Sequence, residues 1–438
     1  MSGPRLRYTL GWIVAAPLLA CYLLWRSLRQ PEYRRHWRER FSGAGERPTG
    51  DGPVVWIHAV SVGETRAAQP LIEALAEARP DLQFVLTHMT PTGRAVGTAL
   101  AQRMTGRLVQ RYLPYELPWA LARFLREARP ALGLVMETEV WPNLLAATRR
   151  AGVPMVLVNA RLSEKSLGRA LRFEALMREA ATGFTQVLAQ AQADAQRLRQ
   201  VYDGPIEVIG NLKFDLLPAN ELLSRGRALR SAWGGRPVWL LASSREGEEA
   251  LVLDAMGPLL QQPDAPILLI VPRHPQRFDD VARLIESRGL ACLRRSQRVW
   301  PDAVPSASSP PAAAVLLGDT MGEMALFYAA ANVTLMGGSL LPFGSQNLIE
   351  SCAAGTPVVL GPSVYNFAQA AGDAIEAGAA TQVSDAPAAV AALQSISADP
   401  ARLMAMREAA ARFAQAHRGA TVRTVDRVLG LLSAPAAR

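Results

Sequence analysis

Residues 53–88 read PVVWIHAVSVGETRAAQPLIEALAEARPDLQFVLTH. The stretch opens with an apolar run over 53–58, which suits a short buried strand. A turn of small residues leads into a helix that we expect over 64–78, and a second apolar run follows at 82–87. Short apolar runs that alternate with helical segments predict a parallel sheet covered by helices on both faces.

The same alternation continues on both sides of a polar segment, residues 214–236, which we expect to be helical and to link two domains. Before this segment the sequence predicts further strands at 131–136, 155–159, 185–189 and 206–210. After it, the predicted strands are 238–242, 267–271, 315–317, 333–336 and 357–360, with a surface loop over 295–312. The expected fold class is α/β, with two doubly wound, Rossmann-like domains facing a cleft and ligands outside the carboxyl ends of the strands.

Composition excludes several classes of protein. The 438 residues carry a net charge of +9, and 50% of them are hydrophobic, which favours large folded cores. The three cysteines form no CxxC pair and the five histidines no HExxH motif, so we expect no metal. Neither lysine, Lys165 or Lys213, stands in a P-loop frame, and no GxGxxG follows a strand, so we expect no cofactor. Basic residues are not interleaved with aromatic ones, so we expect no nucleic-acid partner.

The N-terminal region has an uncharged run of 18 residues, from Tyr8 to Trp25. As a helix it would measure about 27 Å, just enough to cross the hydrocarbon core of a bilayer. The arginine cluster that follows favours the bulk of the chain on the cytoplasmic side and attracts anionic headgroups. We expect a membrane anchor that either spans the bilayer or lies in its interface. Export is the alternative, since the residues up to Cys21 resemble a lipoprotein cleavage site.

Glu64 is the first candidate for chemistry, because it falls in the first turn of a helix directly after a strand. The helix dipole there favours the ionised carboxylate, which can accept a proton from a hydroxyl. One alternative is an acid that merely stabilises the helix start. Another is a nucleophile elbow at Ser61 in an α/β hydrolase, with His274 or His417 as the base.

A second candidate group combines two further strand ends. Glu137 and Glu139 bracket a threonine where a strand ends, and one of them can face the cleft while the other caps a helix. Lys213 stands at another strand end near the domain junction, where it can neutralise a phosphate or carboxylate of a substrate. The alternative for Lys213 is a salt bridge to Asp215 or another neighbour.

Four turns of the second half suit a nucleotide. Arg273 follows a strand, residues 319–324 open a helix, and the glycine-rich residues 337–340 lead to 344–350. Backbone N–H groups at such turns bind phosphate, and Glu350 can accept from ribose hydroxyls. The alternative is a structural role, because residues 320–323 and 347–350 each fit a helix capping box.

These motifs together carry a resemblance to a known family. They are His58–Glu64, Thr90–Gly93, Tyr112–Tyr115, Met136–Glu139, Trp141–Asn143, Asn159–Ser163, Leu212–Asp215, Pro272–Pro275, Gly318–Glu323 and Gly337–Leu340. With them the chain resembles the 3-deoxy-D-manno-octulosonic acid (Kdo) transferases, GT-B glycosyltransferases of lipopolysaccharide assembly, over nearly its whole length to about residue 415.

The resemblance implies a domain organisation. The expected parts are a membrane anchor (1–30), an acceptor-binding domain (31–215), a linker (216–236), a CMP-sugar-binding domain (237–415), and a C-terminal helix and tail (416–438).

The resemblance also implies a reaction and a location. The family transfers Kdo from CMP-Kdo to the tetraacylated glucosamine disaccharide precursor of lipid A, lipid IVA, with inversion and without a metal. The implied partners are the CMP-Kdo donor, the lipid A precursor and a membrane with an anionic surface. The implied location is the inner membrane, with the catalytic domains on the cytoplasmic side. A non-catalytic nucleotide-binding membrane protein and another GT-B enzyme, such as a nucleotide-sugar epimerase, are further alternatives.

Residue roles follow from the matched motifs. Glu64 matches the general base, and Glu137 and Lys213 match residues that support the transition state. The matches to CMP contacts are Pro272, Arg273, Gly322, Glu323, Met324, Asn347, Leu348, Ile349 and Glu350. Further phosphate or donor candidates are Ser243, Ser244, Gly337, Gly338 and Ser339.

The chain departs from the family pattern at two positions. Relatives commonly read Gly-Gly-His-Asn-Pro-Leu-Glu where this chain has residues 344–350, so the uncharged Gln346 replaces a histidine. Arg245 stands where histidine is frequent and can keep a cationic role.

Overall fold

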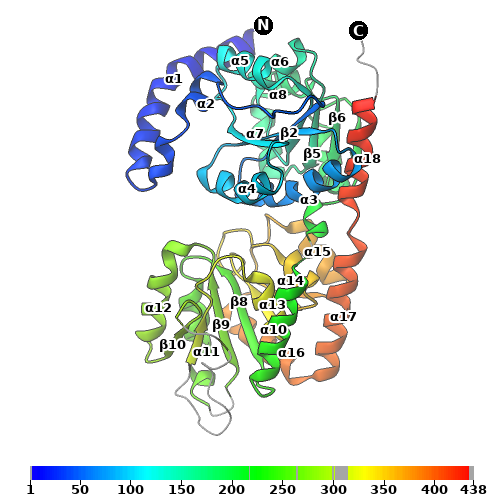
Figure 1. Ribbon diagram of the computed structural model, residues 1–438. Coiled ribbons are helices and arrows are strands. Elements are labelled where there is room, and N and C mark those ends of the chain that lie inside the picture. The colour runs from blue at the N-terminus through cyan, green and yellow to red at the C-terminus, as the bar shows by residue number, and fades with distance from the viewer. Residues whose placement is uncertain (1, 217, 263–264, 298–299, 301–313, 434–438) are drawn as a thin grey trace. The chain divides into compact units, whose positions relative to one another are not determined.

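The structure is a computed structural model that describes residues 2–216, 218–262, 265–297, 300 and 314–433. The chain divides into two compact units: unit 1 is Met1–Leu216 with Arg418–Arg438, and unit 2 is Leu217–His417. Each unit is built on one parallel sheet with helices on its faces (Figure 1). Most of the surface loop expected over 295–312 lies outside the described residues.

Unit 1 has a seven-stranded sheet with the order β3-β2-β1-β4-β5-β6-β7. Its strands are β1 (Val54–His58), β2 (Gln83–His88), β3 (Leu108–Tyr112), β4 (Pro130–Met136), β5 (Met155–Ala160), β6 (Gln186–Ala189) and β7 (Ile206–Val208). His58 pairs with Thr87 of β2 and Val135 of β4, so the chain leaves β1 and β4 at the same edge of the sheet. The strand order reverses between β1 and β4, and such switch points bind ligands in open parallel sheets.

The sequence analysis missed β3, because residues 108–112 include Gln110 and Arg111 and do not read as an apolar run. Arg111 is nevertheless buried. Its guanidinium donates to the carbonyl oxygen of Gly43 and pairs with the Glu127 carboxylate at 3.3 Å. These partners satisfy the buried charge, which apolar patterning alone does not anticipate.

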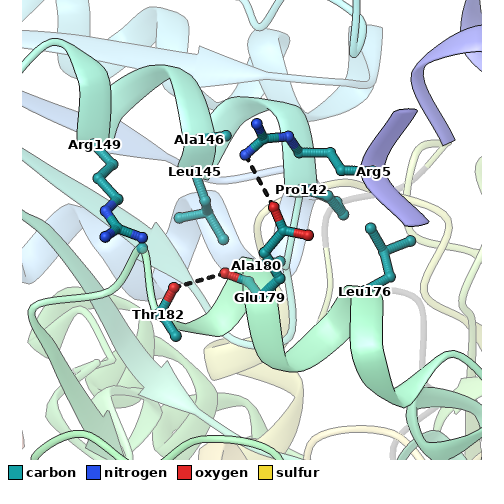
Figure 2. Close-up of a pocket in the computed structure, with 10 residues that line it drawn as sticks. Arg5, Pro142, Leu145, Ala146, Arg149, Leu176, Glu179, Ala180 and Thr182 are labelled. Carbon is teal, nitrogen blue, oxygen red and sulfur yellow. Dashed lines mark hydrogen bonds and ion pairs between the residues drawn. The ribbon is translucent and has the colours of Figure 1, made fainter. Parts of the chain in front are cut away.

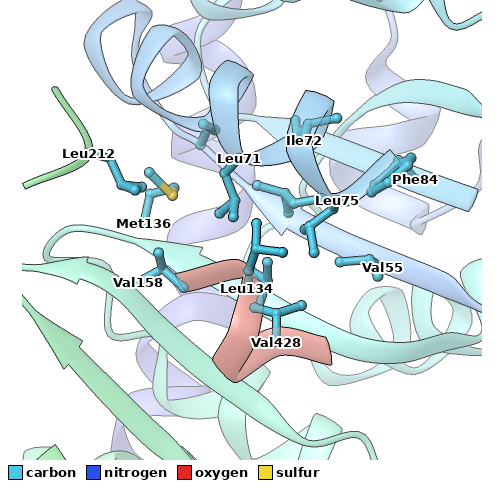
Figure 3. Close-up of a cluster of buried hydrophobic side chains, with 14 of the residues drawn as sticks. Val55, Leu71, Ile72, Leu75, Phe84, Leu134, Met136, Val158, Leu212 and Val428 are labelled. Atoms are coloured by element: carbon cyan, nitrogen blue, oxygen red, sulfur yellow. The ribbon is translucent and has the colours of Figure 1, made fainter. Parts of the chain in front are cut away.

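Helices cover both faces of the sheet of unit 1, and the last helix of the chain joins them. They are α1 (Gly3–Ser27), η1 (Pro31–Arg34), α2 (Trp37–Ser42), α3 (Val62–Ala78), α4 (Pro91–Arg103), α5 (Pro118–Ala128), α6 (Pro142–Arg150), α7 (Glu164–Arg172), α8 (Glu174–Ala181), α9 (Gln192–Leu198), η2 (Leu212–Asp215) and α18 (Ala420–Ser433). Figure 3 shows Leu71 and Leu75 of α3 beside Leu134 of β4 and Val428 of α18. Burying each such side chain stabilises the unit by about 1.5–3 kcal/mol.

Unit 2 has a second seven-stranded parallel sheet, with the order β10-β11-β9-β8-β12-β13-β14. Its strands are β8 (Val238–Ser244), β9 (Ile267–Pro272), β10 (Ala291–Arg294), β11 (Ala314–Leu317), β12 (Val333–Met336), β13 (Val358–Leu360) and β14 (Ala380–Gln382). The switch point lies between β8 and β12. The two edge strands, β10 and β14, were not predicted, because they are short and only partly buried.

The helices of unit 2 include one that the sequence analysis placed in a linker. They are α10 (Asn220–Ala232), α11 (Glu248–Leu260), η3 (Pro275–Arg277), α12 (Phe278–Glu286), α13 (Met324–Ala330), α14 (Leu348–Ala353), α15 (Ala368–Glu376), α16 (Ala386–Ala398) and α17 (Pro400–Ala416). The α10 helix packs against α13. Gly226 permits a close approach there, since a Cβ on it would lie 2.3 Å from the carbonyl oxygen of Leu326.

We predict that Gly226→Ala destabilises the protein by about 1–3 kcal/mol, because the added methyl overpacks the contact between α10 and α13. Gly372→Ala is the matched control: this glycine lies inside α15 with nothing within 4 Å of an added Cβ. That change stabilises by about 0.5–1 kcal/mol, because alanine favours a helix interior. Urea unfolding measures both. Equal small effects would contradict the close packing of α10.

Candidate active site

Glu64 is held at the junction of β1 and α3 by a reciprocal cap. Ser61 is the N-cap residue of α3, and its hydroxyl oxygen accepts from the Glu64 N–H at 3.4 Å. The Glu64 carboxylate in turn accepts from the Ser61 hydroxyl at 2.9 Å and from the Val60 N–H at 2.8 Å. This capping box fixes the orientation of the carboxylate at the carboxyl end of β1.

The environment of Glu64 raises its pKa from 4.5 to about 7. Burial is the largest cause, the negative charge of Glu137 is the second, and the Val60 N–H opposes them. The sequence analysis expected the helix dipole to keep this carboxylate ionised. Burial raises the pKa instead, so this carboxyl gains or loses a proton near neutral pH and is not fully ionised there.

Ser61 uses its hydroxyl in this cap, as a donor to the Glu64 carboxylate. The histidines considered as its base, His274 and His417, both belong to unit 2. His417 contacts the Phe413 carbonyl oxygen and lies 3.6 Å from the Asp373 carboxylate. The arrangement around Ser61 is that of a helix cap.

Glu137 is a buried carboxylate at the end of β4, held by two cations. One of its oxygens, Oε1, lies 2.6 Å from Lys213 Nζ, and the other, Oε2, lies 2.9 Å from Arg161 Nε. Burial alone would raise the pKa of Glu137, but Lys213 and Arg161 outweigh it and hold the pKa below its ordinary value. Glu137 is therefore charged at neutral pH, unlike Glu64.

The cluster joins the ends of three strands. Glu137 follows β4, Arg161 follows β5, and Lys213 lies in η2, just beyond β7. Asn159, in β5, connects this strand to η2, because its side-chain oxygen accepts from the Leu212 N–H at 3.0 Å. Both Glu137 and Asn159 have left-handed backbones, with φ of 59° and 55°. Such strained conformations in non-glycine residues gather at functional sites.

Two residues singled out beside this cluster have other surroundings. Asp215 accepts from the N–H groups of Gly419 (2.7 Å) and Thr421 (2.6 Å), so it caps the start of α18. Glu139 is half-buried, and burial raises its pKa. Arg161 was not predicted as a site residue from the sequence. Its signal is a cation directly after a strand that neighbours β4 in the sheet.

In unit 2, the expected donor residues lie at the carboxyl ends of four adjacent strands, β11, β9, β8 and β12, or in the turns that follow them. Backbone bonds tie three of these turns together: the Arg273 N–H donates to the Ser244 carbonyl (3.0 Å), and the Gly337 N–H to the Ala242 carbonyl (2.8 Å). Ser243 has a left-handed backbone, with φ of 55°. The turns therefore form one continuous edge at the switch point of the sheet.

Glu248 organises this edge, and the sequence analysis missed it. Its fully buried carboxylate accepts from the N–H groups of Arg245 (2.8 Å), Gly338 (2.6 Å) and Leu340 (3.0 Å). Burial raises the pKa of Glu248, and these N–H groups partly offset the effect. The only signal in the sequence is a pair of carboxylates at a helix start, which is common.

Two serines among the donor candidates have buried, occupied hydroxyls. Ser244 donates to the Glu249 carboxylate at 2.6 Å, and Ser339 donates to the Met336 carbonyl while it accepts from the Gly361 N–H at 2.8 Å. Their side chains therefore stabilise the turns.

Of the two helix caps anticipated as alternatives, the one at 347–350 is present, whereas α13 has Glu323 as its N-cap residue and no side-chain cap bond. Thr320 donates to the Glu323 carboxylate at 2.5 Å, and Arg295 pairs with that carboxylate at 2.9 Å, just before Met324 begins α13. Asn347 caps α14 through the Ile349 N–H (3.1 Å) and donates to Glu350 (3.0 Å). Leu348 and Ile349 are buried. Gly322 has a positive φ of 84° and nothing within 4 Å of an added Cβ.

Positive charge surrounds the ends of β8 and β9. The pKa of His274 is lowered first by partial burial and then by three guanidinium groups, those of Arg245, Arg273 and Arg277. The Arg245 group also lies 4.5 Å from the centre of the Phe343 ring. Arg277 is paired with the Glu249 carboxylate at 2.8 Å, and the cations Arg245 and Arg273 suit a phosphate.

Gln346 lies over the glycine turn. Its N–H donates to the Gly337 carbonyl oxygen at 3.0 Å, and its side-chain nitrogen would lie 3.0 Å from a Cβ added to Gly338. Within the described residues, no group of three or more His, Cys, Asp and Glu side chains could hold a metal ion.

Solved structures of low sequence identity share the fold. The structure of S. aureus MnaA with UDP has a TM-score of 0.57 at 15% identity, over 86% of this chain and 97% of that chain. A glycosyltransferase from Rickettsia africae ESF-5 has a TM-score of 0.57 at 13% identity, over 88% and 100%. The two parallel α/β units thus define a protein of the GT-B fold class.

Sequence relatives assign the family. A family model described as 3-Deoxy-D-manno-octulosonic-acid transferase (kdotransferase) matches residues 35–216. The 3-deoxy-D-manno-octulosonic acid transferase of Bordetella pertussis is 48% identical over 96% of this chain and 97% of its own length. That of Haemophilus influenzae is 33% identical over 83% of each chain. The chain belongs to the Kdo transferase family and is a glycosyltransferase.

The raised pKa of Glu64 should make the free energy of unfolding depend on pH. Between about pH 4.5 and 7 the folded state holds a proton on Glu64 that the unfolded chain releases. The contribution of this group to stability therefore falls as pH rises through that window and stays low above it. Glutamine has no proton to lose. The free energy of unfolding of Glu64→Gln, relative to wild type, should thus rise by about 1–2 kcal/mol from pH 5 to pH 8.

Denaturant unfolding at both pH values measures this difference. Glu73→Gln, an exposed position on the same helix, is the control and should show no such trend. A pH-independent difference for Glu64→Gln would show that the carboxyl has an ordinary pKa.

Proposed function

We propose that this protein transfers Kdo from CMP-Kdo to the tetraacylated glucosamine disaccharide precursor of lipid A, with inversion and without a metal. The observation that carries the proposal is the pair of carboxylates at the switch point of unit 1. Glu64 has a pKa near 7, whereas Glu137 is held charged by two cations. Two carboxylates whose environments separate their pKa values can take different roles in one reaction. The names of the relatives supply the donor sugar.

The reaction proposed is a single displacement. The acceptor hydroxyl oxygen attacks the anomeric carbon of Kdo while the bond from that carbon to the CMP phosphate breaks. Glu64 takes the hydroxyl proton, and the electron pair of the broken bond leaves with CMP. Because the new bond forms on the face opposite the leaving group, the anomeric configuration inverts.

Glu137 and Lys213 support the transition state in this scheme. Positive charge develops at the anomeric carbon, and the charged Glu137 carboxylate stabilises it. Lys213 neutralises a carboxylate or phosphate of the donor, and Arg161 keeps Glu137 oriented and ionised. These roles rest on the short contacts of Glu137 with both cations.

Unit 2 binds the CMP portion of the donor in the proposal. Arg273 and the backbone of the turns at Gly322–Met324, Gly337–Ser339 and Asn347–Glu350 contact it, and Arg245 adds positive charge. CMP-Kdo carries one phosphate and no pyrophosphate, so cations and N–H groups can meet the leaving charge without a metal. The electropositive surroundings of His274 support this assignment.

The proposed location is the cytoplasmic face of the inner membrane, where the acceptor lipid resides. The α1 helix is long and apolar enough to cross a membrane, with a mean hydropathy of 1.6 over its most apolar window. Confining enzyme and lipid to one surface raises their effective concentration.

A transfer assay followed by mass spectrometry tests the reaction. Wild type should add Kdo to the acceptor from CMP-Kdo generated in situ, and EDTA should leave the rate unchanged. Glu64→Gln should lower kcat by about 10²–10⁴-fold, because the base is lost. Glu73→Gln is the folded, active control. No mass increase with wild type, beside an active control transferase, would refute the donor and acceptor assignment.

Arg161 supplies a second test, through the pH dependence of kcat. The charge of Glu137 raises the pKa of Glu64, and Arg161 offsets part of that charge. Arg161→Gln should therefore move the midpoint of the pH profile upward by about half a unit, besides lowering kcat. Arg161→Lys keeps a positive charge, so its midpoint should lie closer to the wild-type value than that of Arg161→Gln. Arg150→Gln, at an exposed position on α6, should leave the midpoint unchanged. An unchanged midpoint in Arg161→Gln would remove the electrostatic link.

A further inference from the structure

The α1 helix is attached to unit 1 along one face. Thr9 donates to the side-chain oxygen of Asn143 at 2.9 Å, and the Trp12 ring lies 6.1 Å from that of Tyr115. Further along, Leu23 is buried beside Tyr33. These α1 residues are spaced to share one face of the helix, so the packed stripe extends over most of its length.

Both ends of α1 are also fastened. At the start, Figure 2 shows Arg5 reaching the carboxylate of Glu179 on α8, at 3.1 Å, beside a pocket that α1, α6 and α8 line. At the end, the Ser27 hydroxyl accepts from Arg34 at 2.9 Å, and the Arg26 guanidinium lies 4.7 Å from the centre of the Tyr33 ring. A helix of 25 residues, about 37 Å long, is thus laid against the unit rather than projecting from it.

The opposite face of α1 is apolar and exposed. Val14 is 73% exposed and Leu18 70%. The other large apolar side chains on this face are Leu6, Leu10, Ile13, Tyr22, Leu24, Trp25 and, just beyond the helix, Leu28. We call these residues the outer face of α1. A continuous apolar surface of this length marks a site for a partner or a membrane.

The charged residues in and around α1 indicate which kind of partner covers the outer face. Residues 3–27 contain no Asp or Glu. The exposed cations at and near the ends of α1 are Arg7, Arg26, Arg29, Arg34, Arg35 and Arg38. Arginines that border an apolar face bind anionic headgroups while the apolar side chains enter the acyl region, and Tyr22 and Trp25 suit the interface between the two.

A helix that crossed the bilayer would be incompatible with the packed stripe. The partners of that stripe include charged and polar groups of unit 1: Glu179, Asn143 and the buried carboxylate of Glu116, which accepts from the Asn143 N–H at 2.7 Å. If α1 crossed the membrane with these contacts intact, it would draw them into hydrocarbon, where charged groups are costly.

We propose that α1 lies in the plane of an anionic lipid leaflet, with its outer face in the membrane and its packed stripe on unit 1, and does not cross the bilayer. The inference rests on the proposed membrane-bound acceptor, and it decides between the two placements that the sequence leaves open. Both ends of α1 then stay on the same side of the membrane as the catalytic residues.

Cysteine labelling decides the topology. In a parent with Cys21 and Cys292 changed to serine, the remaining Cys352 is buried. Gly3→Cys is introduced at an exposed position with nothing within 4 Å of an added Cβ, and Asp203→Cys, at a side chain that is 87% exposed, reports the side of unit 1. A membrane-impermeant maleimide is applied to right-side-out and inside-out vesicles, and to detergent-solubilised protein as the measure of full reactivity.

The expected result is that both cysteines react only in inside-out vesicles. Labelling of Gly3→Cys only in right-side-out vesicles would show a spanning helix and overturn the proposal. Protection of residue 3 in both orientations, with full reactivity in detergent, would place it within the bilayer and overturn it too.

Vesicle binding identifies the occupant of the outer face. The variant Leu10→Ser/Val14→Ser/Leu18→Ser should bind phosphatidylglycerol-containing vesicles at least tenfold more weakly than wild type. The control carries three serines at exposed apolar positions of unit 2, Leu251, Ile375 and Met404, and should bind within twofold. An unchanged affinity of the α1 variant, or a shift of the protein from dimer to monomer instead, would contradict a lipid occupant.

Transfer activity in detergent separates this inference from the proposed function. With dispersed acceptor, the outer-face variant should transfer Kdo within twofold of wild type. If wild type itself transfers none, the proposed function fails, while the labelling result still decides the placement of α1.

Discussion

The ion pairs of Glu137 are the interaction on which the site of unit 1 depends. A carboxylate buried at a strand end is stable as an anion only if cations reach it, and here Lys213 and Arg161 lie 2.6 and 2.9 Å from its two oxygens. These contacts join the ends of β4, β5 and β7. They also place a fixed negative charge near Glu64, which adds to the effect of burial and brings the pKa of Glu64 to about 7. The buried pairing therefore keeps Glu137 charged and contributes, after burial, to the raised pKa of Glu64.

Unit 2 uses a buried carboxylate for a different purpose. The buried Glu248 carboxylate accepts hydrogen bonds from three backbone N–H groups and so fixes the backbone of the turns after β8 and β12. The cationic side chains Arg245 and Arg273 then stand beside turns whose backbone is fixed. In both units the carboxylate lies at the switch point of a parallel sheet, where strand ends diverge and leave room for a ligand.

Buried strands made of apolar residues could be predicted from the sequence. Strands and side chains stabilised by specific partners elsewhere in the chain could not. The strands around Glu64 and Glu137 read as apolar runs, whereas β3 contains Arg111, whose charge is satisfied by the distant residues Gly43 and Glu127. Glu64, Glu137 and Lys213 were proposed as site residues from their positions at strand ends and from a family resemblance. Arg161 and Glu248 were not, since their importance arises from contacts between strands. The pKa of Glu64 was misjudged, because a helix start is visible in the sequence and burial is not.

The central claim is that Glu64 is a carboxyl with a pKa near neutrality. The most direct measurement is a ¹³C NMR titration of protein labelled at glutamate side-chain carboxyls, with the Glu64 resonance assigned by its loss in Glu64→Gln. The account predicts a midpoint near pH 7 for that resonance. A midpoint at or below 4.5, the ordinary value, would contradict it.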